Sequence, residues 1–142
     1  MIPLLSGINS TSAALQAERV RMDVVSQNIA NANTSRAADG KPYRRQQVVF
    51  ESELNRAMTS GPSAAAQSVK VARIETDNRP AKLIYEPGHP DANAQGMVAI
   101  PDINIHEEMV DLIASSRAFE ANLAVIKNAR TMALQTLAIG KR

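Results

Sequence analysis

Mostly apolar residues recur every seven positions between residues 104 and 138, in two columns that are offset by four. Two such columns place a continuous apolar seam along one side of an α-helix, as in a coiled coil. Asn104 is a suitable N-cap, Glu107 completes a capping-box-like pair, and Gly140 can supply a left-handed residue after the helix. The first column is Ile105, Leu112, Phe119, Ile126 and Ala133, and the second is Met109, Ser116, Leu123, Arg130 and Leu137.

A second helix is predicted over residues 4–33, where apolar residues again recur every seven positions. Ser6 is a plausible N-cap for this helix. The run Asn31–Thr34 marks its end, because asparagine and threonine favour turns over helix interiors. The apolar stripe consists of Leu4, Ile8, Leu15, Met22, Val25 and Ile29, widened by Val20 and Val24.

The middle of the chain has the composition of short strands separated by turns. Residues 47–50, 69–71, 83–85 and 97–100 are rich in β-forming side chains. Glycine and proline are dense between these runs. Residues 52–68 have no clear period, and we expect a mobile loop near the centre of this stretch.

These patterns predict an α+β fold that is mainly α. Residues 1–34 and 104–142 are expected to form one discontinuous domain, in which the two long terminal helices pack as an antiparallel coiled-coil-like pair. Residues 35–103 are expected to form a small β-rich outer region.

The predicted C-terminal helix is too long for a globule of 142 residues. A helix of about 34 residues spans about 51 Å, whereas a compact chain of this size is roughly 37 Å across. Further apolar residues flank the seam, which favours burial against other chains. Two alternatives are that the β-rich middle folds back over these flanks, or that a simple dimer forms four helices. The sequence does not separate a dimer from an open polymer.

Composition excludes several functions. The net charge is only +2, and the 2 Phe, 2 Tyr and 0 Trp cannot build base-stacking platforms, so nucleic-acid binding is not expected. With 0 Cys the chain has no disulfide or thiol chemistry. No apolar run approaches the ~20 residues of a membrane span. The first charged residue is Glu18, so a cleavable signal peptide is not expected either.

No arrangement of residues predicts catalysis or a metal site. His106-Glu107-Glu108 would need a second histidine at position 110, where the chain has Val110, so acidic residues in a first helical turn are the simpler interpretation. His89 and Asp91 lie between prolines in a turn, and turn chemistry explains them. We therefore expect no enzyme activity and no cofactor.

Segments at both ends of the chain resemble the flagellar axial proteins of the rod and hook. Residues 26–34 are similar to the N-terminal signature of that family, and residues 116–123 are similar to its C-terminal signature. Residues 39–50 and 82–92 resemble the proximal-rod subgroup. Many family members place Gly-Tyr directly after the Asn-Thr, whereas here residues 35–42 intervene before Tyr43, as in that subgroup.

The resemblance implies a structural subunit of the bacterial flagellar basal-body rod, in the periplasmic space. It implies that the terminal helices polymerise as an inner tube around the export channel, forming the drive shaft. Implied partners are copies of the chain, other rod proteins, the rod-to-membrane-ring adaptor and the flagellar type III export apparatus. The alternative is a soluble coiled-coil adaptor that forms a closed dimer. The expected assembly interface consists of Leu4, Ile8, Leu15, Met22, Val25, Ile29, Asn31, Asn33, Tyr43, Met109, Leu112, Ser116, Phe119, Asn122, Leu123, Ile126 and Leu137.

Overall fold

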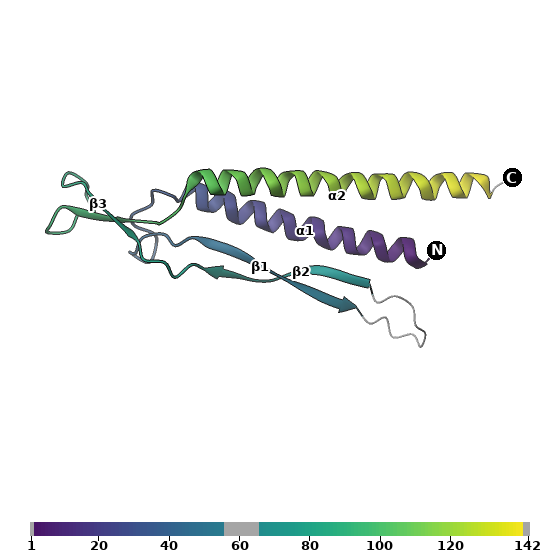
Figure 1. Ribbon diagram of the computed structural model, residues 1–142, viewed down its shortest axis with the longest axis horizontal. Helices are drawn as coiled ribbons and strands as arrows, with labels where there is room; N and C mark the ends of the chain where they lie inside the picture. The colour runs from purple at the N-terminus through teal and green to yellow at the C-terminus, as the bar shows by residue number, and fades with distance from the viewer. Residues whose placement is uncertain (1, 56–65, 141–142) are drawn as a thin grey trace.

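The chain folds into an elongated molecule with two long helices stacked on a β-hairpin. The computed structural model describes residues 2–55 and 66–140, and the side chains of residues 7–52 and 68–140 within them. Figure 1 shows helix α2 on top, helix α1 below it, and the hairpin β1–β2 along the other side of α1. In chain order the elements are α1 (Ile2–Ala30), β1 (Gln46–Asn55), β2 (Ala66–Thr76), β3 (Lys82–Tyr85), β4 (Met97–Ile100) and α2 (Ile105–Ile139).

Helix α2 begins where the sequence predicts and ends differently. The side chain of Asn104 accepts a hydrogen bond from the backbone N–H of His106 at 3.1 Å, which confirms the N-cap. Glu107 accepts from the Asn104 side chain at 3.0 Å. The prediction that Gly140 adopts a left-handed conformation is wrong, because its φ is −72°. Its N–H donates to the carbonyl of Thr136, so Gly140 continues the hydrogen-bond pattern of the helix.

Helix α1 is displaced toward the N-terminus relative to the prediction. It begins at Ile2, so Ser6 lies inside the helix and is not its N-cap. Pro3 is tolerated in the first turn, because the N–H that proline lacks has no helical acceptor there. The helix ends at Ala30, three residues early, and the side chain of Asn31 donates to the carbonyl of Gln27 in the last turn.

The two terminal helices run antiparallel and lie against each other over most of the length of α1 (Figure 1). Ala129 of α2 lines a groove between them, and it is 8% exposed. Arg21 on α1 also forms an ion pair with Asp111 on α2. The antiparallel pair is therefore confirmed, while coiled-coil packing in the strict sense stays a prediction.

The hairpin β1–β2 is longer than the sequence predicts. Its antiparallel ladder runs from Gln46↔Thr76 to Asn55↔Ala66, with an irregularity between Val49 and Phe50. Parts of the expected loop at 52–68 are therefore strand, because backbone pairing continues where side-chain periodicity stops. The centre of that expected loop, residues 56–65, lies outside the described residues.

Strands β3 and β4 form a separate two-stranded sheet, which lies beyond the end of the helix pair at which α2 begins (Figure 1). Lys82 pairs with Ile100 and Tyr85 with Met97, which confirms strands at both predicted positions. Gly96 precedes β4 with a φ of +74°, and a Cβ there would come within 3.0 Å of the Tyr85 ring. This turn therefore requires glycine.

The hairpin covers α1 but leaves α2 largely open. Both of its strands contact α1, and Val24 and Val25 of α1 are 4% and 3% exposed. On α2, in contrast, Val110 and Ile113 are 67% and 52% exposed. The alternative in which the β-rich middle covers the apolar flanks is thus realised for part of α1 and not for α2.

Candidate assembly interface

A buried polar cluster joins the end of α1, the start of β1 and the start of α2. We call it the junction cluster; it consists of Asn28, Tyr43, Arg45, the backbone of Gln46, and Glu108. Asn28 and Glu108 are only 0% and 1% exposed. Polar groups this deeply buried are tolerated in proteins only when they are hydrogen-bonded.

Asn28 at the centre of the junction cluster satisfies its full hydrogen-bonding capacity. Its Nδ2 donates to the carbonyl of Gln46 at 2.8 Å and to Glu108 Oε2 at 2.9 Å. Its Oδ1 accepts from the Gln46 N–H at 2.9 Å and from the Tyr43 hydroxyl at 3.0 Å. One α1 side chain therefore fixes both the first residue of the hairpin and the first turn of α2.

The charge of Glu108 is neutralised by Arg45. Arg45 Nε donates to Glu108 Oε1 at 2.7 Å, and the two side chains are 25% and 2% exposed. A carboxylate with a charged donor on one oxygen and an amide donor on the other is well compensated for burial. The junction cluster thus holds a charge that would otherwise oppose folding.

Tyr43 closes the cluster from the loop that follows α1. Burial, and secondarily the negative charge of Glu108, raise the pKa of its hydroxyl above the usual 10.0. The hydroxyl therefore keeps its proton and donates to Asn28 throughout the neutral range. The stability that this contributes is present below pH 10 and is lost as the pH rises through the folded-state pKa.

Replacing Tyr43 with phenylalanine is expected to lower the free energy of unfolding by about 0.5–1.5 kcal/mol, because one buried hydrogen bond is lost. Asn28 Oδ1 keeps its bond from Gln46, which limits the effect. Urea unfolding followed by circular dichroism measures the change. Tyr85→Phe is the matched control, since Tyr85 is 68% exposed; equal losses in both variants would show that the bond to Asn28 has no special weight.

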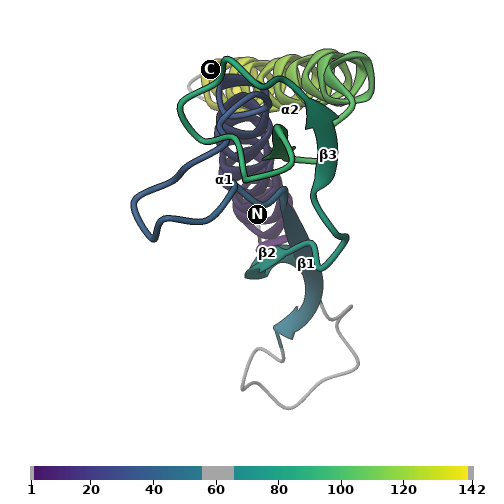
Figure 2. The ribbon, with the colours of Figure 1, turned by 90° about the vertical axis from the view of Figure 1, so that its left-hand side faces the viewer.

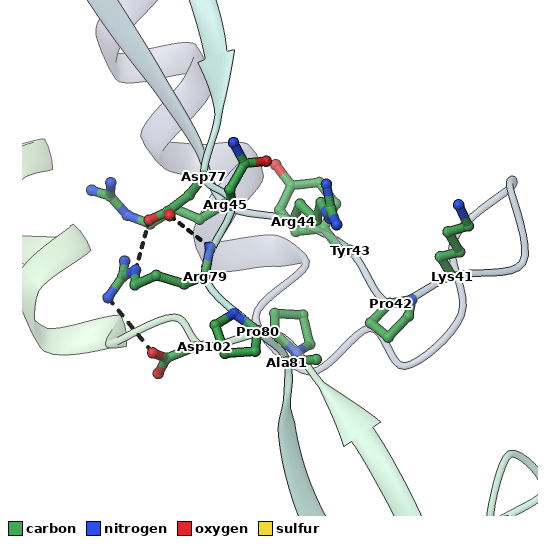
Figure 3. A pocket seen from close by; sticks show the side chains of 12 residues that line it. Lys41, Pro42, Tyr43, Arg44, Arg45, Asp77, Arg79, Pro80, Ala81 and Asp102 are labelled. Carbon is green, nitrogen blue, oxygen red and sulfur yellow. Dashed lines mark hydrogen bonds and ion pairs between the residues drawn. The ribbon is translucent and has the colours of Figure 1, made fainter.

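A cavity of about 180 Å³ lies beside the junction cluster (Figure 3). The acidic groups in its walls are paired, since Arg79 contacts Asp77 at 2.7 Å and Asp102 at 3.6 Å, and Lys41 and Arg44 add further positive charge to the lining. A hydrogen bond from Arg79 holds the pKa of Asp77 below its usual range, and one from Lys82 does the same for Asp102. These mutually neutralised charges connect the ends of strands and helices, and they present no acid and base to a substrate.

The residues that the sequence singled out for metal chemistry have other contacts. Glu108 accepts a hydrogen bond within the junction cluster, and Glu107 accepts one from the side chain of Asn104. His89 accepts from the backbone N–H of Asp91, and Asp91 accepts from Ser35 at 2.8 Å. Within residues 2–55 and 66–140, no group of three or more histidine and acidic side chains is placed to hold a metal ion.

The predicted interface residues are divided by the structure into inner and outer positions. Ile8 and Ile126 line one groove between the helices, and Tyr43 joins the junction cluster. The side chain of Leu4 lies outside the described ones. Val25 is buried; Ile8, Leu15, Met22, Ile29, Asn31, Tyr43, Leu112, Ser116, Phe119, Asn122 and Ile126 are half-buried; Asn33, Met109, Leu123 and Leu137 are exposed.

Of the two columns predicted to form the inner seam of α2, one faces inward in the structure and the other does not. The column of Leu112 and Phe119 faces inward as expected. The second inward column contains Glu108, Ser115 and Ala129, which are 1%, 0% and 8% exposed, in place of the more apolar Met109 column. Small side chains allow the helices to approach closely, and hydrogen bonds satisfy the polar ones.

This shift leaves apolar residues on both sides of α2. We call the first set the first flank; it lies on the side of the Met109 column. The second flank lies on the opposite side, where Val125 and Met132 border a groove beside α1. The outer side between the flanks is mixed, with Arg117, Asn128 and Thr131 beside Val110 and Ala124. The first flank comprises Met109 49%, Ile113 52%, Leu123 52%, Leu134 57% and Leu137 62%, and the second comprises Val125 53%, Met132 57% and Ile139 77%, with the exposed fractions given.

Sequence reasoning missed the junction cluster, although a signal was present. Asn28 follows Val24 and Val25 by one helical turn, and Glu108 lies one turn from Ile105 and Leu112. A polar residue at an apolar position of a helix is a candidate for a buried, hydrogen-bonded group. Its partners could not be inferred, because they are far away in the sequence.

Two protein families match the ends of the chain. Residues 8–37 match the family described as "Flagella basal body rod protein". Residues 94–139 match the family described as "Flagellar basal body rod FlgEFG protein C-terminal". These regions contain most of α1 and all of α2, the two elements that carry the inner seam and the exposed flanks.

Full-length relatives share the same description. The flagellar basal-body rod protein FlgC of Borreliella burgdorferi is 46% identical, over 96% of this chain and 97% of the relative. FlgC of Bacillus subtilis is 42% identical over 94% and 96%. FlgC of Escherichia coli O6:H1 is 38% identical over 97% and 98%.

The fold, the exposed helical flanks and these matches define a structural protein of the bacterial flagellar basal-body rod. Within that class, the chain belongs to the family of the flagellar basal-body rod protein FlgC. The family is structural and not enzymatic, and its location is the basal-body rod. None of the helices, within their described residues, is both long and apolar enough to span a membrane.

Proposed function

We propose that the chain polymerises through its terminal helices into the shaft of the rod, around the channel through which export occurs. The main support for this proposal is the large solvent-accessible surface area of the single chain. The chain exposes 10662 Å², whereas a compact monomer of 15.3 kDa exposes about 7,100 Å². The excess of about 3,500 Å² falls in the range that obligate assemblies bury.

The distribution of apolar surface favours an open array over a closed pair. A two-fold dimer uses one self-complementary surface, whereas a head-to-tail contact joins two different surfaces and can continue indefinitely. Helix α2 has two apolar flanks on opposite sides, and the outer side between them is mixed, with Arg117 and Thr131 in the same column as Val110. A helix in the wall of a tube needs this pattern, because it meets a neighbour on each side and water on a third.

The layer order supports an orientation within the rod. The hairpin lies on the face of α1 that is turned away from α2 (Figures 1 and 2). With the helices as the inner tube, α2 lies nearest the channel and the hairpin lies outside. The proposed partners are further copies, other rod proteins, the rod-to-membrane-ring adaptor in the periplasmic space, and the type III export apparatus that delivers the chain.

Sedimentation velocity of the purified chain over a wide concentration range tests this proposal. We expect the weight-average sedimentation coefficient to rise with concentration without a plateau, because each added subunit presents a new free flank. A plateau at the mass of two chains would instead identify a closed-dimer adaptor. In cells without the chain, basal bodies should lack a complete rod, and complete rods there would contradict the proposal.

A further inference from the structure

Gly7 lies in the interior of α1, in a place where the folded monomer gives no reason for glycine. Its φ is not positive, and a Cβ added to it would meet nothing within 4 Å. Glycine inside a helix lowers helix stability relative to alanine. Glycine inside an element commonly marks the close approach of another backbone. The described residues of the monomer do not supply that backbone.

The open space at Gly7 belongs to an apolar groove of about 360 Å³ between the helices. Ile8 and Thr11 border it on α1, and Val125, Ala129 and Met132 border it on α2. Val125 and Met132 are exposed members of the second flank. The groove is therefore the hollowed part of the second flank, and Asn128 adds a polar side chain to its otherwise mostly apolar lining.

Two exposed leucines lie on the opposite side of α2, and their apolar side chains are of the kind that an apolar groove can bind. Leu134 and Leu137 of the first flank lie one turn apart in the last two turns of α2 and are 57% and 62% exposed. This end of α2 extends past the start of α1 (Figure 1), so its own α1 cannot cover it. The two flanks lie on opposite sides of α2, so these leucines cannot enter the groove of their own chain.

We propose that the groove beside Gly7 receives Leu134 and Leu137 of a second copy of this chain. This inference rests on the proposed polymerisation and specifies one of its contacts. The contact joins the first flank of one copy to the second flank of the next, so it is head-to-tail and leaves a free surface at each end. It also covers part of the excess apolar surface of the helix pair. Gly7 then provides the room that the incoming helix needs.

Disulfide crosslinking tests the contact directly, because the chain has 0 Cys. In the double variant Thr11→Cys, Leu137→Cys, the two positions of one chain are far apart. Thr11 and Val125 line the same groove, and Leu137 lies 12 residues beyond Val125 along α2, about 18 Å further on. A bridge within one chain is excluded by that distance. Oxidised basal bodies from cells that carry the variant should yield a ladder of covalent multimers of this chain.

A second variant tests the role of Gly7. Gly7→Leu in the same background should reduce the ladder at least tenfold, while the thermal unfolding midpoint of the purified chain does not fall. Gly88→Leu is the matched control, because Gly88 also has open space around it and lies in a turn away from the groove. It should leave the ladder unchanged.

Three results would overturn the contact. The first is that the double-cysteine variant forms normal rods but no ladder of multimers. The second is that the ladder persists when Gly7→Leu is added. The third is that the variant crosslinks only to a different rod protein. In each of these cases the chain still assembles, so the proposed function stands. Failure of self-association by sedimentation, together with absence from the rod, would instead reject the proposed function itself.

Discussion

Leu123→Lys is expected to stop rod assembly while the monomer remains folded. Leu123 lies in the middle of the first flank and is 52% exposed in the monomer, so a lysine there meets water before assembly. In the polymer the same side chain would be buried against a neighbour. Losing the burial of leucine costs about 1.5–3 kcal/mol per contact, and burying an unpaired ammonium adds several more.

A loss of about 3 kcal/mol in the binding free energy of one contact raises its dissociation constant roughly a hundredfold. The same loss occurs at every contact between two copies. Swimming in soft agar and the yield of intact rods measure the outcome. Ile74→Lys on strand β2 is the matched control, because Ile74 is 49% exposed but lies on the hairpin. It should leave assembly largely intact. Normal swimming by the Leu123→Lys strain would show that the first flank is not an interface.

Arg45→Met is expected to lower the free energy of unfolding by about 3–5 kcal/mol, because it leaves a buried carboxylate without its counter-charge. Glu108 is 1% exposed and would keep only the amide of Asn28 as a donor. A loss of this size is a large part of the total stability of a small domain. Urea unfolding of the purified chain measures it.

Two further variants separate the charge effect from lost packing. Arg44→Met changes the neighbouring arginine, which is exposed, and should alter stability by no more than about 0.5 kcal/mol. Adding Glu108→Leu to Arg45→Met removes the unpaired charge and should restore part of the lost stability. If the double variant is less stable than Arg45→Met alone, the carboxylate is held by contacts other than this pair.

Local chemistry explains which parts of the fold could be predicted. The Asn104 cap and the strands at 47–50 and 97–100 depend on residues close together in sequence, and the structure contains them. The seven-residue repeat predicted both helices for the same reason. Of its two columns on α2, the one with Leu112 and Phe119 faces inward, whereas Glu108, Ser115 and Ala129 take the inner positions that the pattern predicts for the Met109 column.

That error has a physical origin. A periodic pattern shows which residues share a side of the helix, and it does not show which partner covers that side. The inner side takes the small Ser115 and Ala129 and the hydrogen-bonded Glu108, while Met109 and Leu123 are left outside. The partners within the junction cluster could not be predicted, because the bond from Asn28 to Glu108 joins residues 80 positions apart.

The same separation in sequence bears on when the chain can fold. Closing so long a loop carries an entropic cost that only the completed contacts offset. A chain passing through a narrow conduit cannot join residue 28 to residue 108 until both have emerged, whichever end leads. Under the proposed delivery, the junction cluster must therefore be open while the chain is inside the conduit, and the folded form can exist only outside it.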